Sequence, residues 1–558
     1  MSNYESEFKL ESRMVEQLIK QGYGYIDIKD VKDLENNFRN QMNIHNKLVL
    51  EGKDLSDKEF EKLMIKISGK GIFQSAKELR QKQDIIRDDG TVVYLELFNM
   101  KDWCKNTFQV TRQTTVDGKY VNRYDVTILI NGLPLVQIEL KKRGIDMKEA
   151  FNQIKRYKKH SYFGLYKFIQ LFIISNGVDT KYFANGDQDL NYRFTFYWTD
   201  INNERITNLE QFCVFFLDRC HIAKMIARYM IINETEKMLL VMRPYQVYAV
   251  ENIIDKAINT GNNGYIWHTT GSGKTITSFK ASQILALEPK INQVFFLVDR
   301  KDLDKQTLDE FNKFDPGCVD MTNETYKLVQ QIKDSSKPLI ITTIQKMANA
   351  CSNPRYQNIM AKYKDLKTIF IIDECHRSQF GEMHKTISKT FTNAQYFGFT
   401  GTPRFEENKS QDGRSTADIF GNCLHTYLIK DAIKDDNVLG FSVDYIKTME
   451  SQIDDEQEMV ESIDTDEVFM SDERIALIAN HIIEHHNRKT RDKKYNALFA
   501  VSSIPLLIKY YEMFKMINHN LKIGAIFTYG ANEELDNKDE HSREALDRYM
   551  IDYNKMFN

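Results

Sequence analysis

The sequence predicts an α/β protein with several domains, in which helices cover mixed and parallel β-sheets. Three observations support this prediction: the length of the chain, the alternation of apolar runs with helical segments, and a Gly-rich loop between a strand and a helix. At 558 residues, the chain has room for roughly three to four domains of about 150 residues each. Alternating strands and helices are typical of sheets that carry helices on their faces.

Residues 1–180 are expected to form the first domain. A helical pattern around Met14–Ile19 opens it, and β-rich runs then alternate with helices. The runs are Val92–Phe98, Tyr124–Ile130, Leu135–Leu140 and Phe168–Ser175. Residues 181–235 hold an aromatic stretch and a helical run near Val214–Ile232, and we expect them to be a helical connector.

Residues 236–440 are expected to form a second domain around a parallel sheet, because five apolar runs alternate with helical segments there. The runs are Tyr265–Trp267, Val294–Val298, Leu339–Thr342, Thr368–Ile372 and Tyr396–Phe399. Residues 441–558 are expected to be part of a third domain, with strands at Ala497–Val501 and Ile523–Phe527. Because two strands are too few to complete a parallel sheet, we expect the chain to be truncated.

Composition excludes some classes of protein and leaves others open. The 76 Lys and Arg side chains nearly balance 79 Asp and Glu, so any nucleic-acid binding must come from local patches. Seven cysteines without a C-x-x-C pair or a Cys/His cluster indicate reduced thiols rather than a zinc site or a disulfide framework. No apolar run approaches the ~20 residues that span a bilayer. We therefore expect a soluble cytoplasmic protein that does not contact membranes.

A phosphate-binding loop is expected at residues 268–275, His-Thr-Thr-Gly-Ser-Gly-Lys-Thr, between an apolar strand and a helix. Glycines allow backbone N–H groups to approach the phosphates, the lysine contacts phosphate oxygens, and the last threonine ligates Mg²⁺. His268 stands where the usual pattern has Gly. The residues expected to bind ATP are Thr270, Gly271, Ser272, Gly273, Lys274 and Thr275, with Thr275 also a ligand of the Mg²⁺.

Adjacent carboxylates follow the apolar strand Thr368–Ile372, in the segment Asp373-Glu-Cys-His376. Ligands of open parallel sheets bind at this end of a strand. Asp373 is expected to hold the Mg²⁺ of ATP, and Glu374 to orient and deprotonate the attacking water. Alone, the phosphate loop could be a Gly-rich turn and the carboxylates a surface pair. Found in order, each after a strand, they predict an ATPase.

These motifs resemble superfamily 2 helicases, whose D-E-x-H box matches residues 373–376 and whose next motif matches Thr400-Gly-Thr-Pro403. The resemblance implies a RecA-like first motor lobe at 236–440 and an incomplete RecA-like second lobe at 441–558. It further implies that Gln246 contacts the adenine and that His376 belongs to the ATP site. Thr400, Gly401 and Thr402 would couple nucleotide state to lobe movement. The family's second-lobe arginine motif is absent from the sequence, and without it ATP hydrolysis is expected to fall by ~10³ or more.

A second candidate site lies in two strands around Asn131-Gly132, which suit a tight hairpin turn. Glu139 and Lys141 are two residues apart and share a strand face. A two-residue loop would pair residue 125 with residue 138 and turn Asp125 to the opposite face. We therefore predict a three-residue loop or a β-bulge that brings Asp125 to Glu139. The alternative for an isolated D-x13-E-x-K pattern is ordinary surface charge.

With that shift, Asp125 and Glu139 would bind Mg²⁺ and Lys141 would support the nucleophile or the phosphate charge in phosphodiester hydrolysis. The pattern resembles the core of PD-(D/E)xK nucleases, with Tyr124 in place of the eponymous proline. Gln153 and Tyr157 follow on one helix face. They resemble the Q-x-x-x-Y element of nucleases attached to translocases, which makes them further candidate catalytic residues.

A nuclease followed by a superfamily 2 motor resembles the R subunit of type I restriction enzymes. The resemblance implies ATP- and Mg²⁺-dependent translocation and cleavage of unmodified double-stranded DNA away from the recognition site. It also implies partner subunits, two for methylation (M) and one for specificity (S). One alternative is a stand-alone helicase-nuclease of DNA repair or a type III restriction subunit, although type III proteins carry the nuclease after the motor. Another is a catalytically silent module that binds ATP or DNA.

Overall fold

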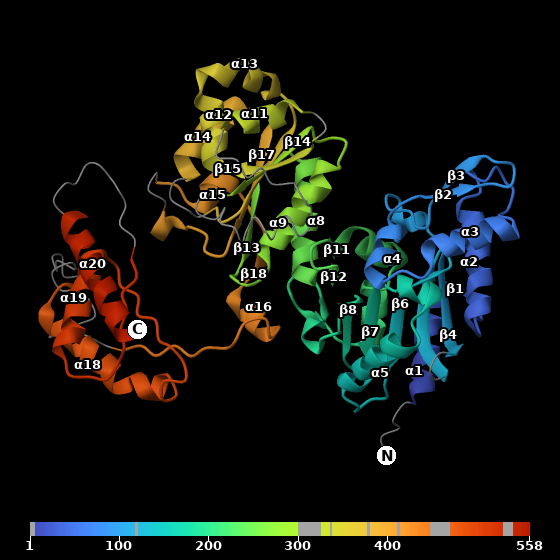
Figure 1. Ribbon diagram of the computed structural model, residues 1–558, viewed down its shortest axis with the longest axis horizontal. Helices are drawn as coiled ribbons and strands as arrows, with labels where there is room; N and C mark the ends of the chain where they lie inside the picture. Colours follow the sequence, from blue (N-terminus) through green and yellow to red (C-terminus); the bar gives the residue numbers. More distant parts are fainter. Residues whose placement is uncertain are drawn as a thin grey trace, which may run out of the picture. The chain divides into compact units, whose positions relative to one another are not determined.

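The computed structural model describes residues 6–117, 121–298, 325–334, 337–375, 380–409, 413–446, 469–527 and 539–557. The chain divides into two compact units, residues 1–440 and residues 441–558. Each unit is considered by itself below. In the first unit, an N-terminal mixed sheet and a parallel sheet are joined by short helices and strands (Figure 1).

The N-terminal sheet has six strands in the order β1-β4-β5-β6-β7-β8. Neighbouring strands run antiparallel except at the β1–β4 and β6–β7 pairs, which are parallel. The strands are β1 (Gly24–Tyr25), β4 (Phe108–Asp117), β5 (Val121–Ile130), β6 (Leu133–Leu140), β7 (Leu171–Ser175) and β8 (Thr180–Ala184). The central strand β6 is buried along its whole length, which explains its nearly continuous apolar sequence.

Helices α1 (Glu7–Lys20) and α5 (Met147–His160) pack against this sheet, α1 on β4 and α5 on β6 and β7. The Ser6 side chain caps α1 by accepting a hydrogen bond from the Lys9 N–H, which satisfies one free donor of the first turn. Helices α2 (Val31–His45), α3 (Asp57–Ile67) and α4 (Ile72–Leu79) and the hairpin of β2 (Gln83–Ile86) and β3 (Val92–Leu95) share the hydrophobic core of this sheet.

The β5–β6 hairpin contains the predicted register shift. Its loop is the two-residue turn Asn131-Gly132, with φ of 50° and 79°. The pairs Ile130–Leu133 and Leu129–Pro134 follow that turn, but Ile128 pairs with Val136, which leaves one extra residue in β6. The β-bulge prediction is therefore confirmed, and the continued register brings residue 125 opposite residue 139.

Residues 181–235 are less helical than expected. Their first residues complete β8. The elements that follow are the 3-10 helix η3 (Tyr192–Phe194), β9 (Trp198–Thr199), β10 (Arg205–Ile206), α6 (Leu209–Phe215), α7 (Arg219–Lys224), the π-helix η4 (Met225–Tyr229) and β11 (Met230–Asn233). Aromatic packing explains the strand content, because Trp198 is buried against Tyr182 and Phe216. The expectation of reduced thiols throughout is also wrong, since Cys104 and Cys220 form a disulfide across 116 residues. Such a pair is invisible to sequence spacing.

The parallel sheet has six strands in the order β15-β14-β16-β17-β13-β18. Its strands are β13 (Gly264–His268), β14 (Gln293–Val298), β15 (Leu339–Thr343), β16 (Thr368–Ile372), β17 (Ala394–Thr400) and β18 (Cys423–Tyr427). All five predicted strands of this region are present. Along β14, Val294, Phe296 and Val298 enter one hydrophobic core while Phe295 and Leu297 enter another, so both faces of the sheet are buried.

Helices cover both faces of the parallel sheet (Figure 1). Contacts with the strands of the sheet are made by α8 (Pro244–Asn259), α9 (Lys274–Ala286), α11 (Thr325–Lys333), α12 (Ile344–Ser352) and α15 (Thr416–Phe420). The region also contains α13 (Gln357–Met360) and α14 (Phe380–Thr390), which pack on α12, and α16 (Ile429–Lys434) after β18. A hairpin of β11 and β12 (Met238–Val241) precedes α8. The core that contains one face of this sheet also extends into the N-terminal sheet.

The second unit contains helices α18 (Asp472–Lys489), α19 (Ile504–Met516) and α20 (Asp539–Phe557). The expected strands at 497–501 and 523–527 are not formed, and the described part of this unit contains no strand. Parallel pairing gains stability only when a sheet buries both faces, and two short apolar runs do not provide that. The assignment of a second RecA-like lobe remains a prediction.

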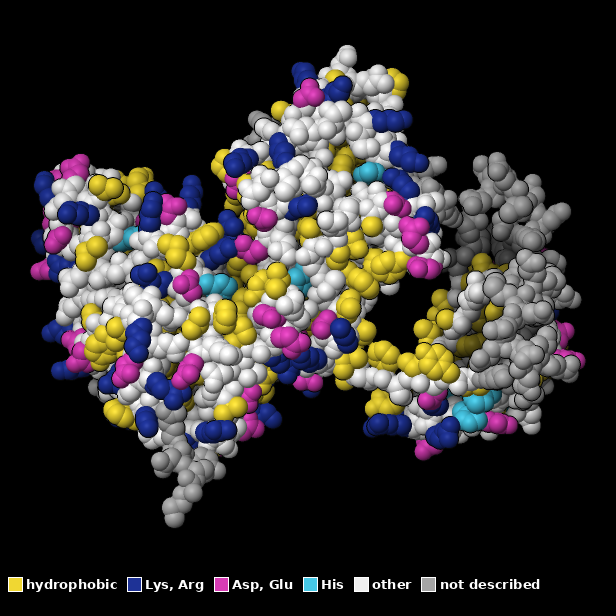
Figure 2. Space-filling view, turned by 180° about the vertical axis from the view of Figure 1, so that it is seen from behind, with side chains coloured by type: hydrophobic (Ala, Val, Ile, Leu, Met, Phe, Trp, Pro, Cys, Tyr) yellow, Lys and Arg dark blue, Asp and Glu magenta, His cyan; other side chains and the backbone are white. Residues whose placement is uncertain are grey.

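No helix in the described ranges is long and apolar enough to cross a membrane. On the molecular face shown in Figure 2, Lys and Arg side chains alternate with Asp and Glu over both sheets, in keeping with the net charge of -3. Any affinity for polyanions must therefore come from local groups of cations.

Candidate nuclease and nucleotide-binding sites

Two carboxylates meet on adjacent strands of the N-terminal sheet. Asp125 of β5 accepts a hydrogen bond at its Oδ2 from the backbone N–H of Leu140, at 2.8 Å. Glu139 of β6 is fully buried. Lys141 follows β6, and its Nζ donates to the Leu140 carbonyl at 3.1 Å. The three predicted residues thus lie together at the carboxyl end of β6.

Burial dominates the electrostatics of this pair. It raises the pKa of Glu139 well above its usual range, the nearby Asp125 adds to the rise, and Lys141 opposes it. Burial also raises the pKa of Asp125, while the Leu140 N–H and Lys141 lower it. Ionising both carboxyl groups in this enclosed position therefore needs a compensating cation.

The Glu139 carboxylate fits a divalent metal ion. Its Oε2 is buried and has no hydrogen-bond partner among the described residues. A buried oxygen without a partner is costly, and Asp125 offers a second carboxylate opposite it. Oxygen ligands of this kind suit Mg²⁺, so the predicted ligands Asp125 and Glu139 match that ion chemically.

The other oxygen of Glu139 is held by helix α5. Gln153 Nε2 donates to Glu139 Oε1 and to Tyr157 Oη, each at 2.5 Å. Tyr157 in turn donates to the Arg123 carbonyl at 3.0 Å. Gln153 and Tyr157, one turn apart on α5, therefore form a chain of hydrogen bonds that fixes the orientation of the Glu139 carboxylate.

Aromatic rings close the inner side of this site. Tyr124, at the position of the eponymous proline, is fully buried and contacts Tyr157, Tyr162 and Tyr166 with ring centroids 5.0–5.3 Å apart. This apolar wall is the physical source of the burial that raises the pKa of Glu139. Tyr124 serves packing here.

The phosphate-binding loop has the backbone that its glycines permit. Gly271 and Gly273 adopt φ of 79° and 77°, the left-handed region that a side chain disfavours. A Cβ on Gly273 would lie 2.7 Å from Gln246 Nε2. Helix α9 begins at Lys274, so the loop directs the N–H groups of a helix N-terminus toward bound phosphate.

The acidic motif lies beside this loop. Lys274 Nζ is 3.5 Å from Glu374 Oε1, and Thr275 Oγ1 donates to Asp373 Oδ2 at 3.4 Å. Glu374 has a φ of 48°, unusual for a residue with a side chain. Such strain gathers at functional sites, where surrounding structure enforces it. The cation, hydroxyl and two carboxylates expected around an Mg²⁺–phosphate group are therefore adjacent.

His268, the departure from the usual loop pattern, turns away from the phosphate cradle. Its Nε2 lies 3.0 Å from Nδ1 of His425 on β18, and both rings are buried. Burial, His425 and Lys274 together hold the pKa of His268 well below its usual range. The substitution for Gly therefore joins two strands instead of contacting the ligand.

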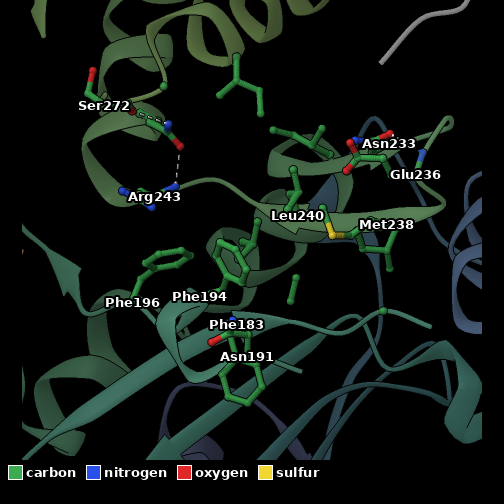
Figure 3. A pocket seen from close by; sticks show the side chains of 18 of the residues that line it. Phe183, Asn191, Phe194, Phe196, Asn233, Glu236, Met238, Leu240, Arg243 and Ser272 are labelled. Carbon is green, nitrogen blue, oxygen red and sulfur yellow. Dashed lines mark hydrogen bonds between the residues drawn. The ribbon is translucent and has the colours of Figure 1, made fainter. Parts of the chain in front are cut away.

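A cavity of about 740 Å³ opens next to the loop. Gln246 sits at its edge, accepting from the Arg243 N–H and donating to the Ser272 carbonyl, both at 3.0 Å. Figure 3 shows this linkage, with Phe194 and Phe196 on the side of the N-terminal sheet. The guanidinium of Arg243 lies 4.6 Å from the centre of the Phe196 ring. The size and aromatic lining suit a nucleotide base.

Comparisons with known proteins agree along the chain. The family model described as type I restriction enzyme R protein N terminus matches residues 4–190, and that of the SWI2/SNF2 ATPase matches residues 245–474. A third, type I restriction enzyme subunit R domain 3, matches residues 493–558.

Curated relatives carry related names. The type I restriction enzyme SsaAORF53P endonuclease subunit of Staphylococcus saprophyticus is 58% identical over 99% of this chain and 60% of its own length. The SauMSSORF170P endonuclease subunit of Staphylococcus aureus is 57% identical with the same coverage. The EcoprrI endonuclease subunit of Escherichia coli is 39% identical over 46% of this chain and 83% of its own length. The chain belongs to the family of type I restriction enzyme R subunits.

This R-subunit chain spans 60% of the length of the staphylococcal relatives. Its N-terminal match covers Asp125, Glu139, Lys141, Gln153 and Tyr157, and its ATPase match covers the phosphate-binding loop and the acidic motif. ATP is therefore the nucleotide that the second match implies.

The proposed coupling segment of the R-subunit chain contacts the phosphate-binding loop. Thr400 ends β17, and its Oγ1 accepts from the Thr402 N–H at 3.0 Å. A Cβ on Gly401 would lie 3.4 Å from both Lys274 Nζ and Thr270 Oγ1. His376, also predicted for the ATP site, lies outside the described residues.

One carboxylate near the nuclease pair escaped sequence reasoning. Glu11 of α1 is 3% exposed and accepts a hydrogen bond from Gln113. Burial is the main cause that raises the pKa of Glu11, and Asp125 adds to it. Its signal was a carboxylate within the apolar stripe of Leu10, Met14, Val15 and Leu18. Gln113 has a φ of 57°, and nothing in the sequence around it indicated this backbone conformation or its hydrogen bond to Glu11.

Proposed function

We propose that this chain is the cleaving and translocating part of a type I R subunit. In that role it cuts unmodified double-stranded DNA away from the recognition site, with Mg²⁺ and ATP. The observation that supports this most strongly is the bulge that sets Asp125 opposite Glu139, whose buried Oε2 has no partner among the described residues. Surface carboxylates, the alternative for this pattern, would be solvated rather than buried.

In the proposed nuclease reaction, Asp125 and Glu139 hold Mg²⁺ through carboxylate oxygens. The ion, when bound, would activate water and neutralise phosphate charge. Gln153 orients Glu139 through its hydrogen bond, and Tyr157 orients Gln153. Lys141 is close enough to act electrostatically on both carboxylates. Its ammonium would support the nucleophile or the charge on the cleaved phosphate.

In the proposed motor, Lys274 binds the β- and γ-phosphate oxygens, and Gln246 contacts the adenine. Thr275 and Asp373 hold the Mg²⁺ of ATP, and Glu374 orients and deprotonates the attacking water. Backbone N–H groups of residues 270–273 complete the phosphate cradle. Thr400, Gly401 and Thr402 transmit the nucleotide state, supported by their position against the loop.

The remaining parts of the proposal concern partners and location. Double-stranded DNA is the substrate, and the methyltransferase (M) and specificity (S) subunits supply site recognition. The chain acts in the cytoplasm. Names of relatives as endonuclease subunits support a role within a larger enzyme, and the shared ATPase match argues against a silent binding module.

The test is Mg²⁺-dependent cleavage of plasmid DNA by the chain, with and without ATP, repeated with added M and S subunits. Lys141→Ala is expected to abolish cutting and leave ATP binding intact. Lys274→Ala is expected to abolish ATP binding and leave the nuclease site intact. Lys142→Ala, an exposed neighbour of Lys141, serves as the control. Equal cutting by wild type and Lys141→Ala in the full assembly would refute the nuclease site.

A further inference from the structure

The disulfide between Cys104 and Cys220 belongs to neither candidate site. Cys104 lies in the short 3-10 helix η1 (Trp103–Lys105) that precedes β4, and Cys220 lies on α7 of the connector. Neither cysteine lines the cavity beside the phosphate-binding loop. The segment between the two cysteines contains β5, β6 and α5, so the bond closes a loop around every residue of the candidate nuclease site.

This disulfide is open to reagents in solution. Cys104 is exposed and Cys220 is half-buried. The other described cysteines are less accessible: Cys213, Cys351 and Cys375 are buried, and Cys423 is half-buried. Burial raises the pKa of Cys213 to about 12 and that of Cys351 to about 11, which keeps them as unreactive thiols. Exposed disulfides are the ones that small thiols open readily.

Contacts that do not involve sulfur hold the same two segments together. The Arg228 guanidinium carbon lies 4.7 Å, and the Lys224 ammonium 5.4 Å, from the centre of the Trp103 ring. Trp103 directly precedes Cys104, and Lys224 lies one turn after Cys220. These contacts remain when the bond is open. The two sulfur atoms then stay close to each other, and closure is favoured as a reaction within one molecule.

The nuclease side of the bond is linked to the β5–β6 hairpin. Asn106 lies two residues after Cys104, and its Oδ1 accepts from Asn131 Nδ2 at 2.7 Å. The Thr107 N–H donates to Asn131 Oδ1 at 2.8 Å. Asn131 begins the tight turn of this hairpin, next to the bulge that sets the register of the carboxylate pair. Hydrogen bonds therefore pass a restraint on η1 to that turn.

The connector side of the bond is linked to the ATPase region. Lys224 ends α7 and forms a salt bridge with Glu251 of α8 at 2.6 Å. Helix α8 also carries Gln246, which donates to the Ser272 carbonyl of the phosphate-binding loop at 3.0 Å. The disulfide thus lies on a continuous path of contacts between the nuclease hairpin and the helix that touches this loop.

We propose that Cys104 and Cys220 form a site of reversible thiol–disulfide exchange, whose state sets how firmly the nuclease hairpin is linked to α8. The co-reactant is a small thiol or its disulfide. To close the bond, one cysteine thiolate attacks an external disulfide and releases one thiolate. The second cysteine then attacks the mixed disulfide and releases the other. Two protein thiols and one external disulfide become one protein disulfide and two external thiols, and opening reverses both steps.

The cytoplasmic location proposed above gives this exchange its setting. Disulfides that form in a reducing compartment are mostly transient and redox-sensing. The exchange itself depends neither on that location nor on the proposed roles of the nuclease and ATP sites, because it rests on the bond and on the contacts around it. Its tests therefore use no DNA, metal ion or ATP.

The first experiment is a redox titration of the full chain. The chain is equilibrated with reduced and oxidised glutathione at varied ratios, starting from either form, and free thiols are alkylated and assigned by peptide mass spectrometry. Cys104 and Cys220 are expected to open and close together and to reach the same state from both directions, while Cys423 stays a thiol. The proposal is overturned if the pair never closes, or if it stays closed in excess reduced glutathione.

The second experiment tests the link by hydrogen exchange of the oxidised and reduced chain. Closure is expected to slow exchange severalfold at the hairpin turn, residues 130–132, and along α8. The double variant Cys104→Ser/Cys220→Ser should match the reduced chain in either buffer, and the control Cys423→Ser should respond as wild type does. Slowing confined to η1 and α7, or an equal response of the double variant to oxidant, would refute the proposal.

Discussion

Replacing Gln153 with alanine tests whether the nuclease site depends on an oriented carboxylate. Gln153 Nε2 is the donor to Glu139 Oε1, while Oε2 has no hydrogen-bond partner among the described residues. The change leaves the carboxylate without that contact and breaks the link to Tyr157. Glu139 would then adopt more than one orientation in the enclosed space, and the proposed Mg²⁺ would lose a fixed ligand.

The size of the effect follows from the role of such supporting contacts. Loss of a hydrogen bond that orients a metal ligand costs about 10–100-fold in metal affinity. This is about 1.4–2.8 kcal/mol of binding free energy. Tyr157→Phe removes the hydroxyl that accepts from Gln153 and donates to the Arg123 carbonyl, but it keeps the Gln153 contact with Glu139. Its loss of affinity should lie at or below the lower end of that range.

The assay is a Mg²⁺ titration of plasmid cleavage by the assembled enzyme, with Mg²⁺-dependent thermal stabilisation of the chain as a readout independent of activity. Lys155→Ala, on an exposed part of the same helix, controls for changes to α5. The expected result is a half-saturating Mg²⁺ concentration raised 10–100-fold in Gln153→Ala. Reduced cleavage with unchanged Mg²⁺ dependence in both readouts would refute the positioning role and assign Gln153 to contact with DNA.

Two further predictions concern the ATPase region. Burial lowers the pKa of His425 to about 4 and that of its partner His268 well below the usual value near 6.5. The folded state holds both imidazoles neutral, whereas the unfolded chain binds protons near pH 6.5. The stability that these neutral histidines contribute is therefore complete above about pH 6.5 and is lost as the pH falls toward their folded-state pKa. Melting temperatures between pH 7.5 and 5 should fall less steeply in His425→Gln than in wild type, and equal slopes would contradict this. Gly273→Ala should lower the unfolding free energy by about 1–2 kcal/mol because φ is positive there, and it should weaken ATP binding in a fluorescence titration. The control Gly261→Ala, with open space around the residue, should change neither the stability nor ATP binding. Equal stability of the two variants would exclude backbone strain at Gly273.

Much of the ATP site is predictable because its parts are contiguous in sequence. The loop at 268–275 and the carboxylates 373 and 374 each follow an apolar strand, and parallel strands bring their ends to one edge of the sheet. The strands of this sheet are predictable for the same reason, since each is apolar on both faces. At 497–501 and 523–527 the same apolar signal misled, because a strand also needs neighbours that the run itself does not reveal.

Contacts between distant segments set the limit of sequence reasoning. Glu11 and Gln113 are 102 residues apart, and Cys104 and Cys220 are 116 apart. The position of Glu11 within an apolar stripe was readable, but its partner depends on how α1 packs on β4. The register of Asp125 was accessible only because Glu139 lies in the same hairpin, where one residue decides which face a side chain occupies.

The strand around Asp125 shows why a local rule fails at this site. Arg112 pairs with Val126 and Thr114 with Tyr124, yet the pair between them, Gln113 and Asp125, is missing from the ladder. Gln113 has left the β region, with a φ of 57°, and its side chain donates to Glu11 instead. A regular strand would keep those backbone hydrogen bonds, so the break needs compensation from the groups around it. The break in β4 lies directly opposite Asp125, and the bulge between Ile128 and Leu129 sets the register that brings Asp125 opposite Glu139. The position of this carboxylate therefore depends on irregularities in both neighbouring strands, which alternation along a single strand does not reveal.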